Sequence, residues 1–188
     1  MELPKRETML PMPKSHYAAS KLAGEYLCHV FHDTYGLETV MLRYFNVFGP
    51  HQNPHSQYAA VIPKFIIAAL TDQSAVIFGD GLQSRDFTYV DNVVEANLRA
   101  INAPKEAVGR VFNIACGNRY SLLELLDTLE HIFGKTIRRE HHTQRLGDVM
   151  HSMADITAAR DLLGYEPKIG FQEGLEKTAA WFREKCPY

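Results

Sequence analysis

A tyrosine and a lysine four residues apart are the strongest chemical signal in this sequence. Tyr17 and Lys21 lie within Ser15-His-Tyr-Ala-Ala-Ser-Lys-Leu-Ala-Gly-Glu25. If this stretch is helical, one turn places the phenol and the ammonium on the same face. A cation beside a phenol favours the phenolate, which can accept a proton from a substrate hydroxyl. Because the same spacing is common on ordinary helix surfaces, the rest of the sequence must decide between a catalytic pair and a surface pair.

Local signals predict the helix that would carry this pair. Ser15 is suited to cap its N-terminus and Gly36 to end it, so we expect a helix over residues 15–35. Its apolar stripe comprises Leu22, Tyr26, Val30 and Phe31, with small residues at Ala18, Ala19, Ala23 and Gly24 beside it. Such a face can pack within the chain or against a second helix.

The rest of the chain alternates between predicted strands and helices, which indicates an α/β fold with ligand-binding loops after the strands. Strands are expected at residues 39–42, 75–78, 111–115 and 137–140, with extended chain at 85–90. Helices are expected at residues 59–70, at 91–102 with Asp91 as N-cap, from a Ser121/Glu124 capping box to Gly134, at 156–163 and at 171–185.

Composition and charge exclude several classes of partner. The 188 residues are 46% hydrophobic and carry a net charge of -2, which suits one globular domain and gives no attraction for nucleic acid or an anionic membrane. No apolar run approaches the roughly 20 residues that span a bilayer. Cys28, Cys116 and Cys186 are odd in number and far apart, so we expect free thiols and a cytoplasmic protein.

The nine histidines do not have the spacing of a metal site. His51 and His55 are four apart, but Pro50 and Pro54 make a regular helix there improbable. His141 and His142 are adjacent and would point apart in a strand. We therefore expect no metal ion.

Four further motifs follow the Tyr-Lys pair in order. They are Arg43-Tyr-Phe-Asn-Val-Phe-Gly-Pro50, Tyr58-Ala-Ala-Val-Ile-Pro-Lys-Phe65, Gly79-Asp-Gly-x-x-x-Arg-Asp-Phe-Thr-Tyr-Val-Asp91 and Arg145-x-Gly-Asp148. Over nearly its whole length the chain thus resembles the extended short-chain dehydrogenase/reductase family of NAD-dependent epimerases and dehydratases. Within that family it is most similar to the 4-epimerases of UDP-glucose, UDP-galactose and their N-acetylated relatives.

The resemblance implies the C-terminal part of a Rossmann-like fold, with the substrate-binding region. Such an enzyme should begin with a strand, a Gly-x-x-Gly-x-x-Gly turn and a helix that binds the cofactor pyrophosphate. No such turn occurs here, so we expect a truncated gene product, a split-gene half or a fragment that lacks the N-terminal dinucleotide-binding strands. Residues 1–48 would be a remnant of the catalytic region. Residues 49–188 would mainly bind the nucleotide sugar, with about 86–115 returning to the Rossmann part.

The resemblance also implies roles for particular residues. Arg85 and Arg145 would bind the diphosphate, Asp148 the ribose hydroxyls and Asn46 a diphosphate or sugar oxygen. Uracil would lie between Ala60 and Val61 on one side and the strand Val76-Ile77-Phe78 on the other, contacted mainly by backbone groups, although these residues are equally suited to a core. Lys64 and Gln52 are nearby in sequence. Ser152 would line the C2 side of the sugar, and its small size would leave room for an acetamido group.

Completed by the missing half, such a protein would be an NAD-dependent isomerase that acts through a transient 4-keto sugar. Tyr17 would take the C4 hydroxyl proton, Lys21 would bind the cofactor ribose and NAD would accept and return hydride. One alternative is a truncated, non-catalytic fragment that binds UDP-sugar or only self-associates. A second is a nucleotide-sugar dehydratase or decarboxylase of the same family. The chain alone is expected to bind no NAD, to form a homo-oligomer through the helix at residues 15–35, and to meet a separate N-terminal half if one exists.

Overall fold

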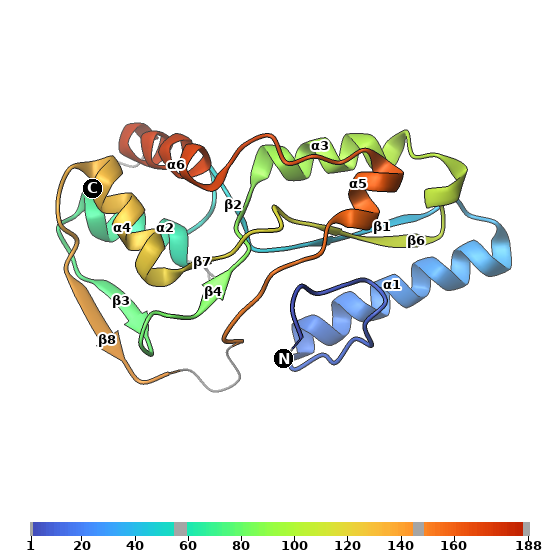
Figure 1. The fold of residues 1–188 in the computed structure, drawn as a ribbon, viewed down its shortest axis with the longest axis horizontal. Helices are drawn as coiled ribbons and strands as arrows, with labels where there is room; N and C mark the ends of the chain where they lie inside the picture. Colours follow the sequence, from blue (N-terminus) through green and yellow to red (C-terminus); the bar gives the residue numbers. More distant parts are fainter. Residues whose placement is uncertain (1, 55–59, 145–148, 186–188) are drawn as a thin grey trace.

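The computed structural model describes residues 2–54, 60–144 and 149–185 (Figure 1). The helices are α1 His16–Tyr35, α2 Val61–Leu70, α3 Val90–Ile101, α4 Leu122–Phe133, α5 Thr157–Leu163 and α6 Phe171–Lys185, with a 3-10 turn at Lys105–Ala107. The strands are β1 Val40–Tyr44, β2 Val47–Phe48, β3 Ala75–Phe78, β4 Ser84–Arg85, β5 Thr88–Tyr89, β6 Arg110–Ile114, β7 Tyr120–Ser121 and β8 Arg139–His142.

Both predicted ends of α1 are confirmed. Ser15 Oγ accepts a hydrogen bond from the Ala18 N–H at 3.1 Å, and Gly36 ends the helix with a φ of 67°, a conformation that glycine adopts without strain. None of the 20 residues of α1 is buried, however, and within the predicted apolar stripe Leu22 is half-buried whereas Tyr26, Val30 and Phe31 are exposed. The helix is attached to β1 mainly through Glu25, whose carboxylate receives the Arg43 guanidinium at 2.6 and 2.7 Å.

The first of two layers is built on a parallel pair of strands. β1 and β6 pair from Val40 opposite Arg110 to Tyr44 opposite Ile114. Helices α3 and α5 lie on one side of this pair and α1 on the other, as parallel strands require for burial (Figure 1). The core of this layer includes Phe112, Ile114 and Tyr165, whose hydroxyl donates to the Ala115 carbonyl at 3.0 Å.

The second layer is a separate core around short strands. It is formed by α2, α4 and α6 with the pairs β3–β8, β2–β5 and β4–β7, and its fully buried side chains include Phe48, Ile66, Leu129 and Phe182. Asn92 joins the layers, because its side chain receives hydrogen bonds from the N–H groups of Lys168 and Ile169 and donates to the Ile169 carbonyl. The predicted division of the chain at residue 48 stays a prediction.

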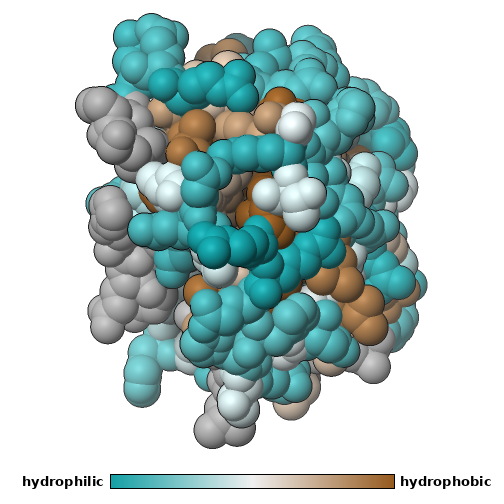
Figure 2. Space-filling view, turned by 90° about the vertical axis from the view of Figure 1, so that its left-hand side faces the viewer, coloured by the Kyte–Doolittle hydropathy of each residue, from teal (hydrophilic) through white to brown (hydrophobic). Residues whose placement is uncertain are grey.

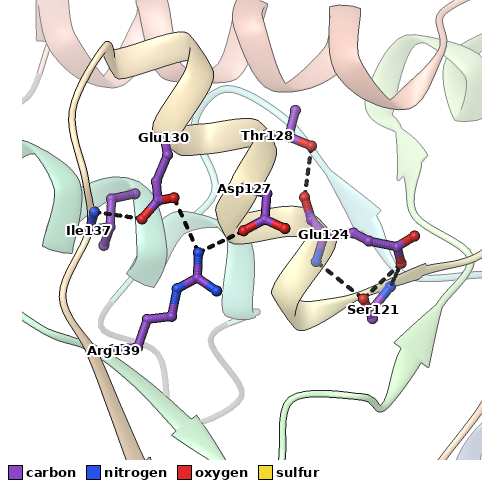
Figure 3. A network of polar contacts seen from close by, with 7 residues as sticks. All are labelled: Ser121, Glu124, Asp127, Thr128, Glu130, Ile137 and Arg139. Atoms are coloured by element: carbon purple, nitrogen blue, oxygen red, sulfur yellow. Dashed lines mark hydrogen bonds and ion pairs between the residues drawn. The ribbon is translucent and has the colours of Figure 1, made fainter.

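Polar contacts on α4 hold β8 in place (Figure 3). Ser121 and Glu124 form the predicted capping box, which begins α4. Arg139 donates to Asp127 at 2.6 Å and to Glu130 at 3.1 Å, and the other oxygen of Glu130 accepts from the Ile137 N–H at 2.8 Å. These contacts fix β8 against α4, and through its pairing with β8 they also fix β3.

Several predicted boundaries were wrong by one or two residues, among them those of β1, which runs to Tyr44 and not to Leu42, of α3 and of β8. Helix α3 begins at Val90 with Tyr89 as its N-cap residue, so Asp91 lies within the first turn and does not cap the helix. In the first turn its carboxylate still interacts favourably with the positive end of the helix dipole. Strand β8 covers Arg139–His142 and starts two residues after the predicted 137, because Ile137 is a buried core residue preceding the strand. No helix in the described part of the chain is long and apolar enough to cross a bilayer.

Candidate nucleotide-sugar site

A cavity of about 580 Å³ lies between α2, β3 and the strand segment that carries Arg85. Its walls are mostly apolar, with Phe48, Phe65 and Phe87 among them, and a few polar side chains enter it, including Asn46, Gln83 and Arg85. Ligand sites commonly combine apolar walls with a small number of directed polar groups. Viewed from the side of β3 and β8, the surface is largely hydrophilic, with hydrophobic atoms visible in a hollow between the hydrophilic ones (Figure 2).

The alternation of β3 decides which of its side chains reach the cavity. Val76 and Phe78 line it, whereas Ile77 is fully buried in the core on the opposite face of the strand. Ala60 and Val61 line the cavity from the start of α2, where the first N–H groups of the helix have no intrahelical partner. The two predicted uracil-flanking segments therefore face one cavity, with only the backbone of Ile77 left for a role there.

Arg85 lines the cavity from β4, and Asn46 lines it from the connection between β1 and β2. The Nη1 of Arg85 donates to the carbonyls of Ser84 at 3.0 Å and Met150 at 3.2 Å, which restrains the guanidinium. Asn46 has a φ of 33°, and its carbonyl accepts from the Thr88 N–H at 3.2 Å. An asparagine tolerates this left-handed conformation better than most residues. The Arg85 side chain is thus held by backbone carbonyls, and the Asn46 main chain is held by its contact with Thr88.

Of the other predicted residues, only some lie at the cavity. Lys64 lines the cavity, but Gln52 and Ser152 do not. The N–H of Ser152 donates to the Ser84 carbonyl at 3.0 Å, so the segment of Ser152 runs beside the strand that carries Arg85. Arg145 and Asp148 fall outside the described residues.

Tyr17 and Lys21 are neighbours on α1, as their spacing predicts. The Lys21 Nζ lies 5.4 Å from the centroid of the Tyr17 ring, which is cation–π distance. Tyr17 is 64% exposed, and neither residue lines the cavity. The described chain therefore presents the pair on an open face and the cavity residues at a separate place.

Sequence reasoning assigned no role to Gln83 and Asp86, which are both buried beside Arg85. Gln83 donates from Nε2 to the Phe78 carbonyl at 2.7 Å and so connects β3 to the wall of the cavity. Asp86 accepts three backbone hydrogen bonds from distant segments. Both residues lie within the Gly79–Asp91 motif. The sequence signal that could have singled them out is a polar residue close to apolar neighbours.

Among the described residues, no group of His, Cys, Asp and Glu side chains is arranged to hold a metal ion. His141 contacts the Gly79 carbonyl at 2.8 Å, and His142 contacts Glu140 at 2.7 Å and packs on the Phe78 ring. These two histidines therefore have local structural partners.

A sequence profile of the NAD dependent epimerase/dehydratase family matches residues 2–115. This match includes α1 with its Tyr-Lys pair, the parallel strands β1 and β6, and Arg85. The chain belongs to this family.

Known proteins agree in sequence and in fold. The UDP-glucose 4-epimerase of Mycolicibacterium smegmatis is 38% identical over 182 residues, which cover 97% of this chain and 57% of that protein. The structure of the UDP-glucose 4-epimerase of Thermotoga maritima with UDP-glucose matches with a TM-score of 0.94 at 37% identity and covers 100% of this chain and 59% of that one.

A third relative carries a different sugar. The UDP-N-acetylglucosamine 4-epimerase of Methanobrevibacter ruminantium, solved in complex with UDP-N-acetylmuramic acid, matches with a TM-score of 0.92 at 40% identity. The match includes 97% of this chain and 58% of that protein. The chain thus spans little more than half the length of these relatives, and it has a Rossmann-like α/β epimerase fold over that span.

Proposed function

We propose that this chain is the UDP-sugar-binding part of a nucleotide-sugar 4-epimerase, corresponding to the family fold from the Tyr-Lys helix onward. One observation carries the proposal: Asn46, Ala60, Val61, Val76, Phe78 and Arg85, from four separate stretches, line one cavity. Its volume of about 580 Å³ is within the usual range for small-molecule sites. Arg85 supplies the directed positive charge that a diphosphate needs, with Arg145 as a second proposed contact.

Roles at the sugar follow from the same correspondence. Tyr17 is the proposed acceptor of the C4 hydroxyl proton, with Lys21 beside it. Ser152 is proposed to lie at the C2 side of the sugar, where its small side chain favours N-acetylhexosamines over substrates that a large residue would select. Asp148 is the proposed ribose contact.

The residues present do not by themselves fit NAD. Tyr17 and Lys21 suit its nicotinamide and ribose side, but the sequence has no glycine-rich turn for the pyrophosphate: Gly24, Gly36 and Gly49 are far apart. We therefore propose that epimerisation requires further family residues, either from a separate N-terminal half or from a longer form of the chain. A chain that binds UDP-sugar without catalysis is the corresponding alternative.

The first test is ligand preference. We expect UDP and UDP-sugars to bind and free galactose, glucose and N-acetylglucosamine to give no measurable heat in calorimetry, because the cavity presents its charged group to a diphosphate. Tyr17→Phe is the matched control, since it removes one hydroxyl outside the cavity and should change the UDP affinity little. Equal binding of free sugars and UDP-sugars would contradict the proposal.

We also expect the isolated chain to bind neither NAD nor NADP measurably. A dinucleotide is held chiefly by its pyrophosphate at a helix N-terminus after a glycine-rich turn, and this turn is missing from the sequence. Calorimetry with NAD tests this, with UDP-glucose as the positive control on the same sample. A micromolar dissociation constant for NAD would show that another segment replaces the turn.

A further inference from the structure

Asp86 directly follows the cavity residue Arg85, and its side chain is completely buried. Its Oδ1 accepts from the Cys116 N–H at 2.9 Å. Its Oδ2 accepts from the N–H groups of Gly117 at 3.1 Å and Ala154 at 3.1 Å. One carboxylate therefore joins three segments: the strand region of Arg85, the loop after β6 and the stretch at residues 149–156.

The stretch at residues 149–156 is also bonded to β4. The Ser84 N–H donates to the Met150 carbonyl at 2.8 Å, the Ser84 carbonyl accepts from the Ser152 N–H at 3.0 Å, and Arg85 Nη1 donates to the Met150 carbonyl at 3.2 Å. The Met150 carbonyl, which restrains the Arg85 guanidinium, and Ala154, which donates to Asp86, thus belong to the same stretch. A shift of this stretch would move both Arg85 and Ser152.

We propose that Asp86 is a positioning residue for the nucleotide-sugar site, which fixes residues 150–154 against β4 and thereby sets the places of Arg85 and Ser152. The ligand named here rests on the proposed function, whereas the positioning itself rests on the three backbone contacts. Asp86 does not touch the cavity and acts only through its neighbours.

The ionisation of the buried Asp86 carboxyl allows its positioning role to be measured separately from its effect on the stability of the fold. Burial raises the pKa of Asp86 to about 6, although its three N–H donors favour the carboxylate. The titratable groups coupled to it are Cys116, whose pKa burial raises to about 11, and Tyr165, whose pKa burial also raises, so both are neutral. His151 contacts Ser84 Oγ at 2.9 Å on the same stretch.

The sign of the linkage follows from this pKa. A raised carboxyl pKa contributes stability that is present below about pH 4 and is lost as the pH rises through about 6. At pH 7.5 the ionised, buried carboxylate therefore has a cost that Asp86→Asn removes. The same change leaves one acceptor oxygen, so it breaks either the contact with Cys116 or the contacts with Gly117 and Ala154. Loss of position without a matching loss of stability is the expected signature.

The experiment compares Asp86→Asn with the wild-type chain at pH 7.5 by amide hydrogen exchange, thermal unfolding and calorimetry with UDP-glucose. We expect faster exchange either at Cys116 or at Gly117 and in residues 150–154, according to which contacts the amide loses, and a dissociation constant raised about tenfold, as when one contact to a charged group is lost. Tyr165→Phe is the matched control, because it removes one buried hydrogen bond beside the same loop without touching residues 150–154. It should leave UDP-glucose affinity unchanged.

Ala154→Pro breaks the contact with residues 150–154 directly, because it removes the N–H that donates to Asp86, while its ring also fixes φ at this buried position. Unchanged exchange in residues 150–153 of the Ala154→Pro variant overturns the inference, as does an affinity loss of that variant no larger than that of Tyr165→Phe. Failure of the wild-type chain to bind UDP-glucose would instead count against the proposed function, and hydrogen exchange would still decide the role of Asp86.

Discussion

Replacing Arg85 with Ala is expected to raise the dissociation constant for UDP about tenfold to a hundredfold, the effect of losing roughly 1.5 to 3 kcal/mol of hydrogen bonding to a charged group. Arg85 lines the cavity, and its guanidinium is already held by the Ser84 and Met150 carbonyls. This restraint lowers the conformational entropy that the Arg85 side chain loses when a ligand binds. Calorimetry with UDP measures the change.

The matched control for Arg85→Ala is Arg110→Ala. Arg110 begins β6, is exposed and does not line the cavity, so the control changes the net charge equally without touching the site. A double variant with Arg145→Ala should bind more weakly still. Unchanged UDP affinity in the double variant would show that only the fold, and not the site, is shared with the relatives.

At tens of micromolar the chain is expected to have a molar mass above that of a monomer, as measured by light scattering. The outer face of α1 exposes Tyr26 by 55%, Leu27 by 58%, Val30 by 53% and Phe31 by 47%. Contiguous apolar side chains of this kind usually mark a contact surface. The edge of β1 away from β6 has no strand beside it in the described chain, which adds a second surface able to associate.

Charge placed on α1 should reduce this association. Leu27→Glu with Val30→Glu is expected to lower the molar mass measured by light scattering. Leu82→Glu, which changes an exposed residue between Gly81 and β4, should leave this mass unchanged. A compact monomer of the unaltered chain at the same concentration would contradict the prediction. So would an equal effect of Leu82→Glu.

Signals that act within one turn of the chain could be predicted from sequence. Ser15 begins α1, Gly36 ends it, and Ser121 with Glu124 begins α4, because each contact forms between residues a few positions apart. Asp91 is not the N-cap, because α3 begins two residues earlier than a cap at Asp91 implies, with Tyr89 as its N-cap residue. Capping preference is a weak signal when tertiary contacts compete.

The lining of the cavity could be predicted where a motif and the alternation of a strand both applied. The resemblance selected Val76, Ile77 and Phe78 together, but only the side chains of Val76 and Phe78 face the cavity, since neighbours in a strand point to opposite faces. The role of Asp86 could not be predicted, because its partners Cys116 and Ala154 are distant in sequence and contribute only backbone N–H groups. Backbone donors leave no trace in residue identity.

The complete lack of buried residues in α1 has a thermodynamic consequence. Most helices in proteins owe their stability to the burial of one face, and α1 has mainly the Glu25–Arg43 contact to the strand beside it. If copies associate through this helix, its folding and the association are one linked equilibrium, governed by mass action. The melting temperature would then rise with protein concentration, so that this segment has no single intrinsic stability.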